Sequence, residues 1–535
     1  METFDPLLYP YGSRRMVHYA RKGMVAASQP LAAQAGLAVL RQGGNAIDAA
    51  IATAACLTVV EPTMNGIGSD AFALVWSAGR LHGLNASGTA PGSISIEALK
   101  KQGHKEMPRH GWIPVTIPGA PAAWASLAER FGRLPLTETL QAAITYAEEG
   151  YPVSPALGQG WQGQADRLSR ELKGPWFKPW FDIFAPGGRA PQIGEMWRSP
   201  DHARTLREIA ETNAESFYRG NLAEAMGAAS AAADGFLTAS DLAAFHPDWV
   251  EPIGVNYRGY KVWEIPPNGQ GLVALMALQI LQGFDFTEKE TVETYHRQIE
   301  AMKLAFVDGL KYITQQDRMS VTVEDLLSES YAAERRALIG DSALDPHPGK
   351  PTSGGTVYLA TADGEGNMVS FIQSNYMGFG SGIVVPDTGI SLLNRGANFS
   401  LDSNHDNRLE PGKRTYHTII PGFLTRGGQA VGPFGVMGGF MQPQGHTQVV
   451  MNTVDFHLNP QSALDAPRWQ WTAGRTVQVE PGVPDHIVEA LIRKGHQIQR
   501  AGGPGFGKGQ IIWRGDDGVL AGGAEPRADS EIASW

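Results

Sequence analysis

The chain has 535 residues, of which 42% are hydrophobic and 18% charged, so it can bury a large core and has the composition of an ordinary globular protein. Its formal net charge of −10, without a long run of Lys or Arg, excludes a typical nucleic-acid-binding protein. Its one cysteine, Cys56, excludes an intramolecular disulfide framework.

The first two thirds of the chain are predicted to be mainly helical. Apolar residues at helical spacing predict two helices within residues 30–59, which Gly43-Gly44 separates, and Cys56 lies on the second as a small core residue. Residues 71–84 predict a hairpin that turns at Ala78-Gly79. Further helical segments are predicted over residues 115–160, 201–245, 272–281 and 291–314.

The pattern changes from helical to extended near residue 356. Strands are predicted over residues 356–362, 368–374 and 382–386, and residues 363–367 predict the turn of a hairpin. Helices, strands, helices and more strands in this order favour a layered α+β or α/β architecture. The N-terminal residues lack a charged start followed by an apolar core, and no stretch approaches about 18 uncharged apolar residues. We therefore expect a soluble, cytoplasmic protein with neither a membrane nor a nucleic acid as partner.

A loop of turn-forming residues, 345–355, runs directly into a strand that begins with Thr356. A threonine hydroxyl inside a chain is a weak nucleophile. Cutting the peptide bond before it frees an α-amino group that can act as its base, and this group titrates at about 7.7–8.0 in model peptides. The arrangement suggests self-cleavage between Gly355 and Thr356. The alternative is that Gly-Gly-Thr is simply a loop that enters a strand.

Other motifs fail on closer reading. Residues 502–508 nearly match a phosphate-binding loop, but Gly509 stands where Ser or Thr is needed, and a strand-like segment follows in place of a helix. Residues 66–71 match a dinucleotide fingerprint, but a helix precedes them where a strand is needed. The 14 histidines include no His-Glu-x-x-His pair, and the chain has no Gly-x-Ser-x-Gly elbow. We therefore expect no metal and no cofactor.

Several motifs, in one order and spacing, resemble a known family from about residue 22 to the C-terminus. They are Gly43-Gly-Asn-Ala-Ile-Asp-Ala-Ala50 with Glu61-Pro62, Ala301-Met-Lys-Leu-Ala-Phe306, Gly355-Thr356, Asp363-Gly-Glu-Gly-Asn367, Gly378-Phe-Gly-Ser-Gly-Ile383, Gly438-Gly439 and Asp465-Ala-Pro-Arg468. On these residues the chain is similar to the γ-glutamyltransferase (glutathione hydrolase) family of N-terminal-nucleophile hydrolases. The resemblance implies an α+β fold, a four-layer αββα sandwich. It implies cleavage into a large fragment, 1–355, and a small catalytic fragment, 356–535, which stay associated.

The resemblance also assigns the catalytic residues. Thr356 would attack an amide carbonyl and form an acyl-enzyme, which water or an amine then resolves. Ser374 takes the place of a family threonine that hydrogen-bonds the nucleophile, although it can also be read as a strand-end hydroxyl that faces solvent. Gly438 and Gly439 match the pair whose backbone N–H groups face the developing oxyanion, although a glycine pair is often just a turn.

The residues that would recognise the substrate depart from the family pattern. The family's arginine for the glutamyl α-carboxylate would align near Ile96, and its acidic residue for the α-amino group aligns with the uncharged Asn398. Arg395 stands in place of a glutamine, Tyr376 in place of an asparagine, and His417-Thr418 in place of a serine pair. Arg395 either offers a planar fork to a carboxylate or forms a surface ion pair.

We therefore predict a self-processing amidohydrolase, an acylase that acts on glutaryl-like or related acyl amides. Two alternatives stay open: a genuine glutathione hydrolase or γ-glutamyl transpeptidase, and an uncleaved, inactive binding relative. The expected partner is a small-molecule amide. The oligomeric state is open, and a homodimer is one option.

Overall fold

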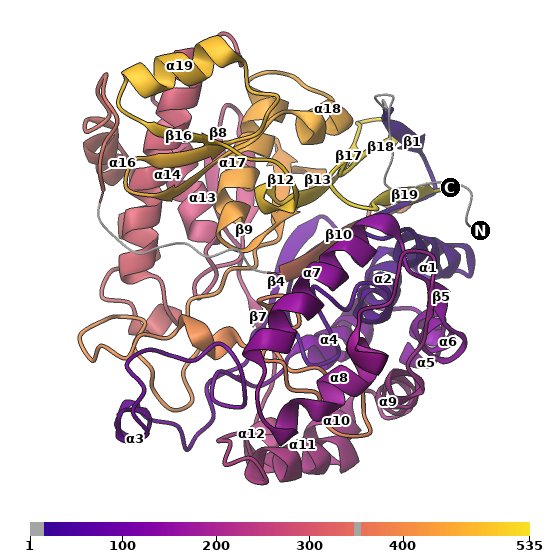
Figure 1. Ribbon diagram of the computed structural model, residues 1–535. Helices are drawn as coiled ribbons and strands as arrows, with labels where there is room; N and C mark the ends of the chain where they lie inside the picture. The colour runs from indigo at the N-terminus through magenta and orange to yellow at the C-terminus, as the bar shows by residue number, and fades with distance from the viewer. Residues whose placement is uncertain (1–14, 347–354) are drawn as a thin grey trace.

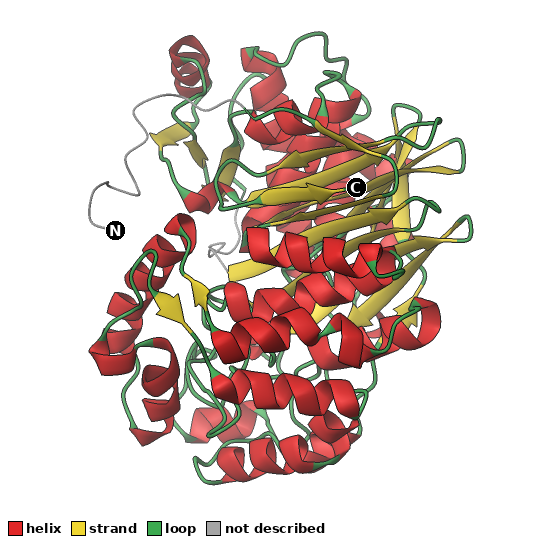
Figure 2. Cartoon of the chain, turned by 90° about the vertical axis from the view of Figure 1, so that its right-hand side faces the viewer, coloured by secondary structure: helices red, strands yellow, loops and turns green. Residues whose placement is uncertain are grey.

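The computed structural model describes residues 15–346 and 355–535. Within these ranges two seven-stranded sheets face each other, and helices cover the outer face of each sheet (Figure 1, Figure 2). The αββα sandwich expected from the sequence is therefore confirmed.

Both sheets are antiparallel, and their strands come from distant parts of the chain. The first sheet has the order β19 (Glu531–Ser534), β2 (Gly23–Ala27), β10 (Gly355–Asp363), β11 (Met368–Tyr376), β3 (Asp70–Ser77), β4 (Arg80–Ala86) and β7 (Asp248–Val250). The second has the order β1 (His18–Ala20), β18 (Leu520–Ala524), β17 (Lys508–Arg514), β13 (Gln429–Met437), β12 (Gly422–Arg426), β9 (Tyr260–Glu264) and β8 (Ile253–Tyr257). Two small sheets comprise β14 (Trp469–Ala473), β15 (Thr476–Val479) and β16 (Gln497–Arg500), and β5 (Tyr151–Pro152) and β6 (Met196–Trp197).

Helix α2 (Ala46–Val60) shows how the outer layer forms. Every one of its residues is buried, because its small alanines let it pack closely between α1 (Pro30–Arg41) and the first sheet. Asn45 and Asp48 form a capping box at its start. The same layer includes α4 (Ala120–Phe131), α5 (Leu136–Thr139), α6 (Gln141–Glu149), α7 (Pro155–Glu171), α8 (Lys178–Phe184), α9 (Pro200–Glu211), α10 (Glu215–Arg219), α11 (Asn221–Ala231) and α12 (Ala239–Ala243).

The second sheet carries its own helical layer. Apolar residues of α13 (Gly271–Leu281) and α17 (Gln442–Val454) pack against its outer face, with α14 (Val292–Tyr312) behind α13. The remaining helices are α3 (Ile96–Lys101), α15 (Val323–Leu326), α16 (Glu329–Arg336), α18 (Pro460–Asp465) and α19 (Asp485–Arg493).

A separate apolar core fills the space between the two sheets. It includes Phe72, Ile372 and Tyr358 of the first sheet and Phe423, Met437 and Ile512 of the second. Side chains along a strand alternate between its two faces. Ser374 and Asp70 stand two residues beyond the paired Ile372 and Phe72, so their side chains face this interior at one end of the sandwich.

Most of the elements expected from the sequence are confirmed, and one is wrong. The two early helices and the hairpin turn at Ala78-Gly79 lie where they were predicted, and Cys56 is fully buried. Residues 382–386 form no strand: only Val384 pairs there, in an isolated bridge with Ser391. Glycines at 378, 380 and 382 have φ values of 58°, 69° and 74°, which turn the backbone away from an extended path. Across the described residues, no helix has the length and apolarity needed to span a membrane.

Candidate active site

Thr356 is the second residue of β10, at the end of the inter-sheet core, and is only 2% exposed. Its Oγ1 donates a hydrogen bond to Ser374 Oγ over 3.1 Å. Ser374 Oγ in turn donates to the carbonyl oxygen of Gly355 over 2.7 Å and accepts from the backbone N–H of Tyr376 over 2.7 Å. The hydroxyl of Ser374 thus contacts both the predicted nucleophile and the carbonyl of the bond predicted to be cut. The solvent-facing reading of Ser374 is wrong, because this residue is fully buried.

Little space surrounds Gly355, the residue before the predicted nucleophile. A Cβ atom on Gly355 would lie 2.7 Å from the backbone nitrogen of Gly378 and 3.2 Å from Met64 Sδ. The pairing of β10 with β11 also shifts register between Gly355 and Val357, which places a bulge at this bond. Residues 347–354, which precede it in the predicted cleavage loop, lie outside the described residues.

Three polar side chains lie on adjacent strands of the first sheet: Thr356 on β10, Ser374 on β11 and Asp70 on β3. Asp70 pairs directly with Ser374 across β3 and β11. Its carboxylate accepts hydrogen bonds from Arg395 Nε at 3.1 Å and Nη2 at 3.3 Å, and it lies 2.5 Å from His417 Nε2. Burial alone raises the pKa of Asp70, but Arg395 and His417 outweigh it, so the net shift is downward. Asp70 is therefore a buried, ionised carboxylate opposite Ser374, the partner of the predicted nucleophile.

His417 is held in its neutral form. Burial lowers the pKa of His417 to about 4, and the charge of Arg395 acts in the same direction. The backbone N–H of Ile419 donates to Nδ1 over 3.3 Å, which assigns the proton to Nε2, where it faces Asp70. His417 therefore orients Asp70 and offers no second base for Thr356.

Arg395 is fully buried, so the predicted surface ion pair is wrong. Two of its nitrogens bind Asp70, the third donates to Thr418 Oγ1 over 2.7 Å, and the guanidinium lies 4.5 Å from the ring centre of Tyr376. Its charge is therefore already matched inside the chain.

Tyr376 and Asn398 extend the same polar network. Tyr376 has a φ of 77°, a strained conformation for a residue with a side chain, and its hydroxyl lies 2.5 Å from Asn398 Oδ1. Asn398 Nδ2 donates to the carbonyl of Tyr416 over 3.0 Å. Ile96, the position expected for the missing arginine, lies in an apolar cluster with Phe399. The structure thus joins all five predicted substrate-binding residues in one network.

The predicted oxyanion pair follows β13, the strand of the second sheet that faces β10. Gly438 and Gly439 have φ values of 139° and 61°, which favour glycine. Gln270 links this pair to Thr418, because its Nε2 donates to the carbonyls of Gly439 (2.9 Å) and Thr418 (2.5 Å). Tyr416 donates its hydroxyl hydrogen to Gln270 Oε1 over 2.9 Å.

Asp70 and Gln270 were missed as site residues. Asp70 lies within residues 66–71, which were considered only as a dinucleotide fingerprint. Placing residues 70–76 beside 368–374 would have revealed its contact with Ser374, but strand pairing is not visible in one sequence. Gln270 follows a turn-forming segment and carries no signal of its own.

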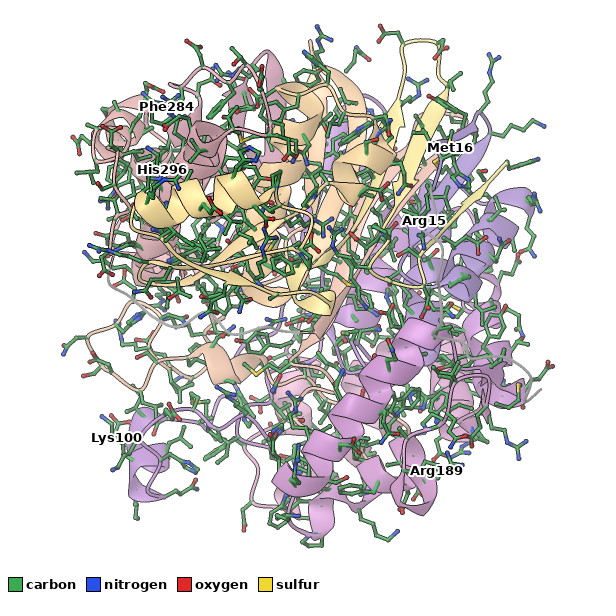
Figure 3. All side chains as sticks on the ribbon, turned by 45° about the horizontal axis from the view of Figure 1, so that its top comes forward. Arg15, Met16, Lys100, Arg189, Phe284 and His296 are labelled. Carbon is green, nitrogen blue, oxygen red and sulfur yellow. The ribbon has the colours of Figure 1, made fainter. Side chains whose placement is uncertain are left out.

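A second buried polar cluster lies in the helical layer of the other sheet, beside α19 (Figure 3). Ligand-type atoms of His296, Glu300 and His496 lie within 4.8 Å of one another. Lys303 Nζ, however, is 2.7 Å from Glu300 Oε1 and 3.0 Å from the carbonyl of Leu344. Because this ammonium already neutralises the carboxylate, we assign no metal to the cluster.

Comparisons with known proteins agree along the whole chain. A sequence model of the family described as gamma-glutamyltranspeptidase matches residues 32–535. The glutathione hydrolase-like YwrD proenzyme of Bacillus subtilis (strain 168) is 37% identical over 522 residues, covering 95% of this chain and 97% of that protein. The oxamate amidohydrolase proenzyme of Klebsiella pneumoniae is 34% identical over 530 residues, covering 96% and 98%. The crystal structure of cephalosporin acylase from Bacillus halodurans is 66% identical, has a TM-score of 0.97 and covers 100% of this chain and 99% of its own.

Proposed function

The chain belongs to the gamma-glutamyltranspeptidase family, and within it we propose that the protein is a self-processing amidohydrolase with Thr356 as its nucleophile. The observation that carries this proposal is the position of Ser374 Oγ, 3.1 Å from Thr356 Oγ1 and 2.7 Å from the carbonyl oxygen of Gly355. A hydroxyl placed there contacts both the attacking atom and the bond under attack.

Self-cleavage proceeds in two steps. Thr356 Oγ1 attacks the carbonyl carbon of Gly355 while its proton leaves through Ser374. The peptide C–N bond then breaks, the nitrogen takes up a proton, and an ester joins Gly355 to the threonine oxygen. Water hydrolyses the ester, leaving a carboxylate on Gly355 and a free α-amino group on Thr356.

The processed enzyme uses this amino group as its base. The amino group accepts the proton of Thr356 Oγ1 as the oxygen attacks the amide carbonyl of a substrate. The N–H groups of Gly438 and Gly439 stabilise the oxyanion that develops. The base returns the proton to the leaving amine as the C–N bond breaks, and water then attacks the acyl-enzyme and releases the acid.

The acyl group that we propose has no α-amine. Asn398 offers an ammonium no countercharge, and the carboxylate of Asp70 is already paired with Arg395, so a γ-glutamyl head group meets an unfavourable environment. The high identity to a cephalosporin acylase supports an acylase in preference to a glutathione hydrolase. We assign Arg395, Tyr376, Asn398, His417 and Thr418 to the wall of the acyl pocket, where Arg395 holds Asp70 and Thr418 in place.

A matched pair of 4-nitroanilides tests this function. We expect the processed wild type to hydrolyse the glutaryl anilide with a higher kcat/KM than the γ-glutamyl anilide, and Thr356→Ala to hydrolyse neither. A clear preference for the γ-glutamyl compound would instead identify a glutathione hydrolase, the function suggested by the relative from Bacillus subtilis.

A further inference from the structure

An acyl group that carries a carboxylate needs a positive partner in the pocket, and Arg395 is already matched by Asp70. A second cation, Lys508, begins β17 in the second sheet. It is the last residue of the glycine-rich segment 502–508, which fails as a phosphate-binding loop. What this lysine does is therefore open.

Lys508 is placed next to the oxyanion pair. It begins β17 and pairs with Met437, the residue directly before Gly438. Its neighbour Gly507 touches Gly438 so closely that a Cβ on Gly438 would lie 3.0 Å from the Gly507 Cα. Lys508 and Ile512 are four residues apart on β17, so their side chains point to the same face of the sheet. Ile512 faces the core between the sheets, and the side chain of Lys508 therefore points into the sandwich.

The ammonium end of the Lys508 side chain lies near residues that contact Gly355. Lys508 Nζ lies 3.7 Å from Glu61 Oε1, at the end of α2. The backbone N–H of Met64 donates to the carbonyl of Glu61 over 3.2 Å, and Met64 Sδ borders Gly355. The side chain of Lys508 thus spans from the oxyanion pair to the turn that supports the bond before Thr356.

Glu61 is a weak counter-ion for this lysine. At 3.7 Å the contact is longer than a hydrogen bond, and the other carboxylate oxygen of Glu61 accepts from the hydroxyl of Ser28. Burial raises the pKa of Glu61, and Lys508 offsets this only in part. The side chain of Lys508 is 11% exposed, so most of it is removed from water.

We propose that Lys508 binds the terminal carboxylate of the substrate's acyl group, so that the acyl pocket is specific for dicarboxylic acyl chains of about glutaryl length. This inference rests on the proposed function. A carboxylate would supply the ammonium with charged hydrogen-bond acceptors that Glu61 does not provide. Arg395 and Asp70 neutralise each other and would leave this role to Lys508.

The test compares two anilides that differ only in the distal charge. Glutaryl and valeryl 4-nitroanilide are assayed with the processed wild type, Lys508→Met, Lys508→Arg and a control, Lys101→Met, which alters an exposed lysine of α3. We expect Lys508→Met to raise KM for the glutaryl anilide by at least about tenfold and to leave kcat/KM for the valeryl anilide within about threefold. Lys508→Arg should retain most of the glutaryl preference, and Lys101→Met all of it.

A second readout does not depend on turnover. Calorimetry should detect glutarate binding to the processed wild type and to Lys101→Met, and a loss of at least about tenfold in affinity for Lys508→Met. Equal losses for both anilides, or unchanged glutarate binding in Lys508→Met, would overturn the role of Lys508. A wild type that hydrolyses valeryl as well as glutaryl anilide would also overturn it, while the amidohydrolase function would stand. A processed wild type that binds glutarate through Lys508 but hydrolyses neither anilide would contradict the proposed function alone.

Discussion

At the scale of single residues, the hydroxyl of Ser374 forms three hydrogen bonds: with Thr356 Oγ1, with the carbonyl oxygen of Gly355 and with the backbone N–H of Tyr376. We predict that Ser374→Ala slows self-cleavage and lowers the kcat of the fraction that is processed by about 100-fold, because Thr356 Oγ1 loses the partner that orients it. Ser370→Ala is a matched control, since Ser370 lies on the same face of β11 and hydrogen-bonds Tyr358. Similar kcat values for the two variants would contradict the role of Ser374.

Gly439 carries the second residue-scale prediction. Gly439→Val should reduce kcat by about 10²–10³-fold, because a side chain at a φ of 61° distorts the donors of the oxyanion site. Gly428→Val provides the control: its φ is 79°, its Cβ would meet nothing within 4 Å, and it lies in the turn between β12 and β13. If both variants lose the same fraction of kcat, the loss reflects backbone strain, and the Gly438-Gly439 pair has no oxyanion role.

The pKa of His417 predicts how stability depends on pH. An unfolded histidine titrates near 6.5, whereas the folded pKa of His417 is about 4. Between these values the unfolded chain binds a proton that the folded chain does not bind. The stability from neutral His417 is therefore fully present above about pH 6.5 and is lost as the pH falls towards 4.

We expect the urea midpoint of the Thr356→Ala chain to fall between about pH 7 and about pH 4.5, and to fall less steeply when His417→Gln is added. The Thr356→Ala background keeps a single uncleaved chain in every sample. Two identical slopes would show that His417 does not contribute to this pH dependence.

At the scale of elements, the order of strands bears on what happens after cleavage. β10, the first strand of the small fragment, lies between β2 of the large fragment and β11, and β11 in turn pairs with β3 of the large fragment. We predict that the two fragments co-elute as one particle in gel filtration and separate only in denaturant. Elution of free fragments under native conditions would contradict this expectation.

Helices and hairpins could be predicted from residues that are close in sequence. The candidate site could not, because it depends on contacts between strands and loops that are far apart in sequence. The helices within residues 30–60 and the hairpin of β3 and β4 follow from apolar spacing and from turn residues that are neighbours in sequence. The segment 382–386 has strand-forming residues, but the glycines before it impose positive φ values, and so the prediction was wrong there. The pairing of β3 with β11 places Asp70 opposite Ser374, and Arg395, 325 positions from Asp70 in the sequence, reaches it from a separate segment.

At the scale of the whole molecule, the two sheets bring together residues that neither holds alone. The first sheet supplies Thr356, Ser374 and Asp70, and the second supplies Gly438-Gly439 and Lys508. Close contact between the sheets fixes their spacing: a Cβ on Gly435 of β13 would lie 2.4 Å from the ring of Tyr358 on β10. The sandwich itself therefore aligns the nucleophile with the proposed oxyanion donors.

The most direct measurement is intact mass spectrometry with N-terminal sequencing of the purified wild type and of Thr356→Ala. We expect the wild type to yield two chains, residues 1–355 and 356–535, with the smaller beginning at Thr356, and the variant to stay a single inactive chain. Active wild-type protein that contains no chain beginning at Thr356 would contradict the central claim.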